Sequence, residues 1–165
     1  KYCCEGFLML HDIWRSGFVR RWHSNPDMAH TAQTNAQHQW GCAVLAHRLF
    51  PVDYELLVAA LLHDVGEDGV GDISGPAKSR HSDLKAASEN AEADRFASLG
   101  LDVPIKTLQL TLVDRIEGYL WARHHMPSIM CRDGWPEVLN GIYSLADHLD
   151  VGPDVTDLMV AAYDR

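Results

Sequence analysis

The apolar run that ends at Leu62 leads into a histidine and a group of acids, in the stretch LLHDVGEDGVGD. If this stretch were only a solvated turn, the pairing of His63 with Asp64 would be incidental. Adjacent residues point about 100° apart on a helix, so both can reach one metal ion only near a helix end, where this pair lies. Neutral imidazole and carboxylate suit a first-row divalent metal, but two ligands are too few. The stretch therefore predicts a metal site that takes further ligands from other helices.

One histidine and two aspartates are candidates for these further ligands. His38 lies near the start of a predicted helix, and Cys42 follows four residues later on the same face. A lone histidine there could instead be a capping or core group that bonds a backbone carbonyl. Asp114 and Asp147 each interrupt an apolar helical run, which is costly unless the carboxylate is paired or binds a metal. The residues alone leave both aspartates open.

The rest of the acidic stretch offers groups that could move protons. Glu67 comes three residues after Asp64, close enough to face the same ion and to accept or relay a proton. Asp72 closes a glycine-rich turn, and glycine permits a close approach of the backbone to a substrate. By itself such a turn is more often a plain surface turn. The phosphate-binding pattern GxxxxGK[ST] is absent, and the calcium-loop pattern breaks at Gly66.

Helical periodicity recurs along the chain, and no segment alternates convincingly with period two. The sequence therefore predicts an all-α fold of about seven helices, forming one domain over residues 1–165. Residues 18–35 lack a sustained period and are predicted to be a loop, and a loop of this length is more often functional than idle. The helices are expected at residues 2–16, 34–50, 53–64, 82–99, 105–125, 135–149 and 155–163.

Two of these helices carry further expectations about burial. The first, over residues 2–16, is expected to face the core through residues that include Leu10, Ile13 and Trp14. The third is apolar nearly all round from Leu56 to Leu62, the pattern of a central helix surrounded by others. In the helix that follows Pro104, Ile105 is expected on the apolar side.

Composition and charge limit the possible partners. A formal net charge of -9 argues against binding a nucleic-acid polymer, because that affinity depends on many Lys and Arg side chains. A small anionic substrate remains possible if a few basic residues converge or a metal supplies positive charge. The four cysteines form no CxxC pair, so neither a zinc knuckle nor a disulfide framework is indicated. With no apolar run of eighteen residues, we expect a cytoplasmic protein without membrane association.

Taken in order, these residues resemble the HD-domain phosphohydrolases, an all-helical superfamily that binds divalent metals. The resemblance is closer to the 5'-deoxynucleotidase branch, which carries Arg-Trp, a single His, HDxxExxxxD, Pro-x-Lys and an Asp that leads into Tyr-Leu. This chain has all of these elements between roughly residues 20 and 121, with two additional residues between Arg-Trp and the single His. They are Arg21-Trp22, His38, the stretch from His63 to Asp72, Pro76-Ala77-Lys78, and Asp114 followed by Tyr119-Leu120.

The resemblance assigns a role to each matching position. It implies that the metal ligands are His38, His63, Asp64 and Asp114, so that Asp147 takes a structural role. Glu67 is expected to handle the proton, and Asp72 to bind the metal-bound water or the sugar hydroxyl. Near the substrate it implies Arg21 and Lys78 against phosphate, Trp22 against the base and Pro76 as a wall for the purine, although an isolated Trp more often packs in a core.

Small phage-encoded members of this branch look still more similar. They act on dATP in viruses that replace adenine by 2-aminoadenine, so the resemblance implies a dATP triphosphohydrolase of the host cytoplasm that depletes the dATP pool. The cofactor would be one or more divalent ions, with Co, Mn, Zn, Fe and Mg all open, and the protein would be a homo-oligomer. The alternatives are a 5'-deoxynucleotidase for monophosphates, a nucleotide sensor without turnover, and a helical interaction module.

Overall fold

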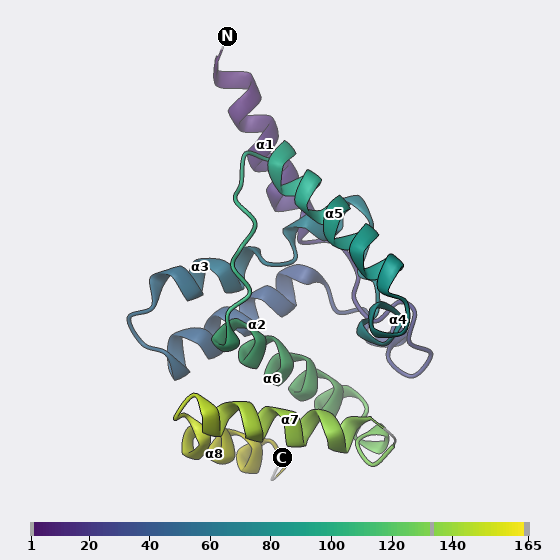
Figure 1. The fold of residues 1–165 in the computed structure, drawn as a ribbon, viewed down its shortest axis with the longest axis vertical. Coiled ribbons are helices and arrows are strands. Elements are labelled where there is room, and N and C mark those ends of the chain that lie inside the picture. The colour runs from purple at the N-terminus through teal and green to yellow at the C-terminus, as the bar shows by residue number, and fades with distance from the viewer. Residues whose placement is uncertain (1, 133, 164–165) are drawn as a thin grey trace. The chain divides into compact units, whose positions relative to one another are not determined.

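The computed structural model describes residues 2–132 and 134–163, in which helices are joined by loops (Figure 1). Its eight α-helices and three short 3-10 helices, with no strand beyond an isolated bridge between Arg20 and Thr34, confirm the predicted all-α fold. The helices are α1 (Tyr2–Ser16), η1 (Ala29–Thr31), α2 (Asn35–Leu49), α3 (Tyr54–Leu62), η2 (Val65–Gly69), α4 (Gly75–Arg80), α5 (Ser82–Ser98), α6 (Leu108–His125), η3 (Pro127–Ile129), α7 (Trp135–His148) and α8 (Gly152–Tyr163). None of the helices in these described ranges is long and apolar enough to cross a membrane.

Side-chain caps set the starts of three helices. Thr34 and Gln37 bond reciprocally at the start of α2, because Thr34 N–H donates to Gln37 Oε1 at 2.9 Å and Gln37 N–H lies 3.4 Å from Thr34 Oγ1. Asp53 Oδ1 accepts from the Leu56 N–H at 2.8 Å and so caps α3. Thr107 caps α6 by accepting from Leu110 N–H at 3.0 Å.

The cap at Thr107 corrects one prediction. Helix α6 begins at Leu108, so Ile105 lies outside the helix and is 81% exposed instead of on its apolar side. Helix α4, which was not predicted, is only six residues long, and a segment this short cannot display a helical period.

The chain forms two compact units, Lys1–Gln39 with Leu62–Pro104 and Trp40–Leu61 with Ile105–Arg165. The chain passes from one unit to the other within α2 after Gln39, within α3 after Leu61, and again after Pro104. The expectation of a single domain stays a prediction.

The core of the first unit holds η2 against α5. Val65, Phe96 and Leu99 are buried together, and Ile13 of α1 packs on them. Gly66 makes this packing possible, because a Cβ there would lie 2.9 Å from the backbone oxygen of Glu92 on α5. The start of η2 therefore packs closely against α5.

The second unit is built on the long helix α6, whose buried face packs on α7 and α8. Gly41 of α2 lies against Glu117 of α6, where a Cβ would come within 2.6 Å of Glu117 Cγ. Tyr119 and Tyr163 join α6 to α8 through their hydroxyls, 2.8 Å apart.

Two expectations about burial were wrong. Helix α3 is not central, since Leu56 and Ala60 are buried but Val58 and Leu61 are 54% and 43% exposed. On α1, Leu10 and Trp14 are 63% and 65% exposed, and Ile13 is the residue that packs in the core. An apolar pattern indicates which side chains benefit from burial, but the packing of neighbouring elements determines which of them are covered.

Candidate metal centre

Three of the four predicted metal ligands meet in the first unit. The Nε2 atoms of His38 and His63 are 3.2 Å apart, and Asp64 Oδ2 lies 3.6 Å from the first and 3.4 Å from the second. His38 is fully buried, whereas His63 and Asp64 are partly exposed. The cluster therefore has a buried side and a side that solvent can reach.

The spacing of these donor atoms fits a divalent ion. Two ligand atoms about 2.1 Å from one ion lie roughly 3.0 to 3.5 Å apart at octahedral or tetrahedral angles. The three separations in the cluster, 3.2, 3.4 and 3.6 Å, are close to that range. Two imidazoles and a carboxylate are also a donor set that first-row divalent metals accept.

The ends of two helices produce this convergence. Helix α3 ends at Leu62, and His63 and Asp64 occupy the turn before η2. Freed from helical geometry, these two neighbouring side chains can approach one point. His38 comes one turn after the start of α2 and enters the cluster from that helix.

Arg21 forms an ion pair with the carboxylate of Asp64. Its Nη1 donates to Asp64 Oδ2 at 2.7 Å, and its side chain is only 14% exposed. The backbone of the loop holds it there, because Arg21 N–H donates to Gln33 O at 2.9 Å next to the bridge between Arg20 and Thr34. A cation thus stands directly beside a predicted metal ligand.

Glu67 is buried in η2, where its Oε2 accepts from Asn35 Nδ2 at 2.9 Å. Burial raises the pKa of Glu67 to about 8, and the negative charges of Asp64 and Asp72 act in the same direction. The bond from Asn35 and the charge of Arg21 oppose this rise of the pKa. Glu67 is therefore an acid that titrates near neutrality beside the cluster.

A hydrogen bond joins the side chain of Asp72 to the backbone of Trp22. Trp22 has a φ of 62°, unusual for a residue with a side chain, and Asp72 Oδ2 accepts its backbone N–H at 3.1 Å. The indole Nε1 donates to the buried Gln33 Oε1 at 2.6 Å. The loop and the acidic turn thus hold Trp22 at both its backbone and its ring. Sequence reasoning did not single out Gln33, because a glutamine in a loop carries no signal of this bond.

Lys78 of α4 faces the acids of the first unit. Its Nζ donates to Glu92 Oε1 at 3.1 Å, and Ser88 Oγ donates to the same oxygen at 2.6 Å. Burial tends to lower the pKa of Lys78, but the bond to Glu92 and the charges of Glu92, Glu67 and Asp64 raise it above the usual value. Lys78 therefore stays positively charged. Pro76 is exposed in the first turn of α4, and its contact with a purine stays a prediction.

Asp114 lies in the second unit, on α6, with Cys42 of α2 nearby. The ligand atoms of these two residues lie within 4.8 Å of each other, and Cys42 Sγ donates to the carbonyl oxygen of Val113 at 3.9 Å. Cys42 is a potential ligand that sequence reasoning noted only for its position four residues after His38. Asp147 is exposed near the end of α7, beside Gly152. The assignment of Asp114 as fourth ligand stays a prediction.

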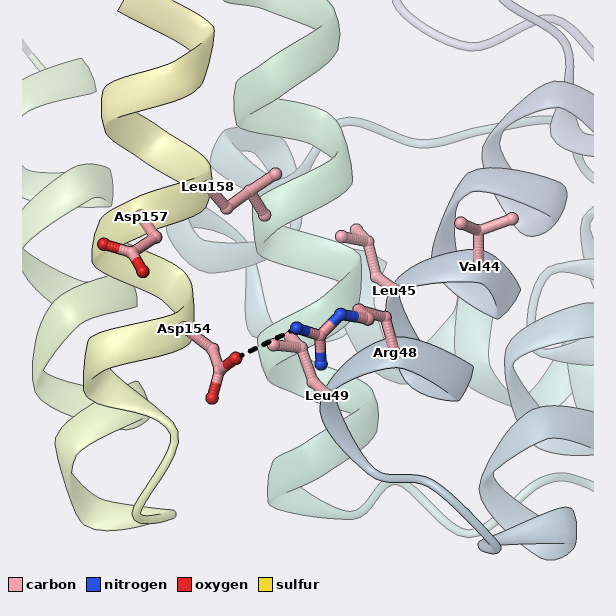
Figure 2. Close-up of a pocket in the computed structure, with 7 residues that line it drawn as sticks. All are labelled: Val44, Leu45, Arg48, Leu49, Asp154, Asp157 and Leu158. Carbon is pink, nitrogen blue, oxygen red and sulfur yellow. Dashed lines mark ion pairs between the residues drawn. The ribbon is translucent and has the colours of Figure 1, made fainter.

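A cavity of about 400 Å³ lies in the second unit, between α2 and α8 (Figure 2). Its apolar side is formed by Val44, Leu45, Leu49 and Leu158, and Arg48 pairs with Asp154 across it at 3.4 Å. None of the predicted site residues lines this cavity. The candidate metal centre is therefore identified from its donor atoms and charged groups, and not from this cavity.

In a comparison with known families, a model of the HD domain matches residues 35–152. This span begins at the first residue of α2 and contains His38, His63, Asp64, Glu67 and Asp114, whereas Arg21 and Trp22 precede it. No curated protein and no solved structure matches the chain significantly.

Proposed function

Since the chain belongs to the HD-domain family of metal-dependent phosphohydrolases, we propose that it removes phosphate from deoxynucleotides, and most specifically from dATP. The observation that carries this proposal is the bond from Arg21 to Asp64, because it puts a cation for phosphate beside a carboxylate that faces two histidines. The choice of dATP is supported by the resemblance of the motifs to the phage enzymes that act on it.

We assign His38, His63, Asp64 and Asp114 to the metal. A divalent ion bound by these residues would supply a Lewis acid and a bound water of lowered pKa. Cobalt, manganese, zinc, iron and magnesium are all candidates for the site, and more than one ion can take part.

Glu67 is the group that we assign to the proton. In the hydrolysis, the water oxygen forms a bond to phosphorus, the bond from phosphorus to its leaving oxygen breaks, and the Glu67 carboxylate takes the proton of the water. A pKa of about 8 suits this role, because a group that titrates near the working pH can both accept and release a proton.

The remaining residues would bind the substrate. Arg21 and Lys78 are positively charged and offset the charge that develops on the phosphate oxygens. We assign Trp22 to the base and Pro76 to the wall of the purine site. Asp72 holds the backbone of Trp22 through Oδ2, and we assign its other oxygen to the sugar hydroxyl.

We further propose that the protein is a homo-oligomer of the cytoplasm. The support for association is the exposure of large apolar side chains in the second unit. Trp40 and Val44 of α2 are 68% and 49% exposed, and Tyr54 and Val58 of α3 are 74% and 54% exposed.

The test is an activity screen of the purified protein over nucleotides and metals. dATP, dADP, dAMP and ATP are incubated with Mn²⁺, Co²⁺, Zn²⁺, Fe²⁺ or Mg²⁺, and the products are identified by ³¹P NMR. We expect hydrolysis of dATP that a chelator abolishes. Cleavage of dAMP without dATP would favour the monophosphate nucleotidase, and nucleotide binding without turnover would favour a sensor. If a chelator changed neither activity nor the melting temperature, a helical interaction module would fit better.

A further inference from the structure

Asn35, which no motif singled out, is bonded to two parts of the candidate metal centre. It is the first residue of α2 and is fully buried. Its Nδ2 lies 2.9 Å from Glu67 Oε2 and 3.2 Å from the backbone carbonyl oxygen of Asp64. A carbonyl oxygen can only accept, so the orientation of the Asn35 amide is fixed with its nitrogen toward both partners.

The start of α2 does not require the Asn35 side chain as a cap. Thr34 and Gln37 already bond reciprocally at this helix end. A buried asparagine in the first turn would ordinarily be explained by capping, since its side chain competes well for free backbone N–H groups. Here Nδ2 instead bonds to the turn and the 3-10 helix that carry Asp64 and Glu67.

The two bonds join three elements of the centre at one side chain. Asn35 precedes His38 by three residues on the same helix, so the two residues occupy neighbouring positions on one face of α2. Through Nδ2 it is also fixed to the backbone of Asp64 and to the carboxylate of Glu67. Its Oδ1 is buried, and no atom of the described residues donates to it. That oxygen remains an acceptor on the side of the amide opposite to Glu67.

We infer that Asn35 is a positioning residue that holds the Glu67 carboxylate in register with His38 and Asp64. This inference rests on the proposed function for the role of Glu67 in turnover. The placement of Glu67 by Asn35 does not depend on that function and can be measured without it. Without Asn35, the Glu67 side chain loses its hydrogen-bond donor and with it a fixed orientation.

A double-mutant cycle tests the contact in the metal-free protein. Asn35→Ala, Glu67→Ala and the double variant are unfolded with urea in the presence of a chelator. We expect the change that Asn35→Ala makes in the unfolding equilibrium constant to differ by about threefold or more between the parent and Glu67→Ala backgrounds. Thr34→Ala is the matched control, because it weakens the same helix start without touching Glu67. Its effect should be the same in both backgrounds.

A kinetic cycle on the metal-loaded protein tests the positioning role. In the parent, Asn35→Ala should lower kcat roughly tenfold and leave KM within about twofold, because the bond orients a reacting group. In the Glu67→Ala background it should lower kcat no further. Thr34→Ala should leave kcat close to that of the parent.

The outcomes separate this inference from the proposed function. Additive effects of Asn35→Ala and Glu67→Ala on unfolding would overturn the inference, as would a kcat unchanged by Asn35→Ala. If unfolding showed the coupling but the parent hydrolysed no nucleotide, the placement of Glu67 by Asn35 would be supported and the proposed function would fail.

Discussion

The guanidinium of Arg21 donates a 2.7 Å hydrogen bond to Oδ2 of Asp64, the same oxygen that faces His38 and His63. This oxygen is therefore shared between a fixed cation and the position proposed for a divalent ion. In the proposed reaction Arg21 would attract the phosphate, while its charge would oppose the charge of the metal.

Replacement of Arg21 should change activity and metal affinity in opposite directions. We expect Arg21→Ala to lower kcat/KM roughly 10²-fold, because a cation beside the reacting phosphate is lost. The same change should tighten metal binding, because the positive charge that repels the metal ion and bonds to Asp64 Oδ2 is removed. Nucleotide kinetics and isothermal titration with Mn²⁺ measure the two effects. Arg20→Ala, a neighbouring exposed arginine, is the control and should alter neither. Weaker metal binding in Arg21→Ala would contradict this account of the site.

If His38 binds a metal ion, the ion should stabilise the folded protein and raise its melting temperature. A ligand present at 100 times its Kd stabilises a folded protein by about 2.7 kcal/mol if it binds the folded state alone. We expect Mn²⁺ or Co²⁺ to raise the melting temperature of the parent by several degrees and to have little effect on His38→Ala. His47→Ala changes an exposed histidine of the same helix, so it should respond to metal as the parent does. An equal metal response in His38→Ala and His47→Ala would remove His38 from the ligand set.

Glu67 should make the metal-free protein less stable as pH rises. Its pKa is raised from 4.5 to about 8 in the folded protein, so folding favours the protonated acid. That stabilisation is fully present below pH 4.5 and is lost as pH rises toward 8. In Glu67→Gln the side chain stays neutral, so its urea midpoint should exceed that of the parent by an amount that grows from pH 5 to pH 8. Glu89→Gln, at an exposed site on α5, should follow the parent at every pH. Parallel curves for Glu67→Gln and the parent would mean that Glu67 is not buried as described.

The contact between η2 and α5 predicts different effects at two glycines of the same 3-10 helix. In Gly66→Ala, the new Cβ would lie 2.9 Å from the Glu92 backbone oxygen and 2.9 Å from Phe96 Cε2, so η2 must shift. We expect a loss of about 1–3 kcal/mol in unfolding free energy, together with lower activity, because Glu67 follows directly. Gly69→Ala, whose Cβ would approach nothing closer than 3.9 Å, should change stability little. Urea unfolding of the two variants makes the comparison, and equal losses would show that η2 is not packed in this way.

Local sequence was sufficient to predict the parts of the centre that depend on one helix end. The apolar run up to Leu62 and the polar residues after it predicted that His63 and Asp64 lie at the end of a helix. In the structure, α3 ends at Leu62. Helices with long periodic patterns and clear stop residues were predicted for the same reason. Asn35 was missed because its two bonds reach residues 29 and 32 positions away, and nothing in the residues around it indicates them.

The burial of single side chains was harder to predict. Trp14 and Trp40 are large apolar residues at helical spacing, yet they are 65% and 68% exposed. Periodicity identifies the side of a helix that is apolar, while the neighbouring elements decide whether that side is covered. The same limit applies to Arg21, which meets Asp64 across 43 positions of sequence.

The backbone N–H of Trp22 donates to Asp72. The length of the loop that contains Trp22 therefore constrains the position of Asp72. The indole of Trp22 is also bonded to Gln33, so Trp22 cannot change its position to accommodate an inserted or deleted residue without losing a bond. A change of loop length between Gly17 and Asn35 would thus break one of the two attachments or displace Asp72. Substitutions of single side chains elsewhere on the loop would therefore preserve both attachments of Trp22 more readily than insertions or deletions would.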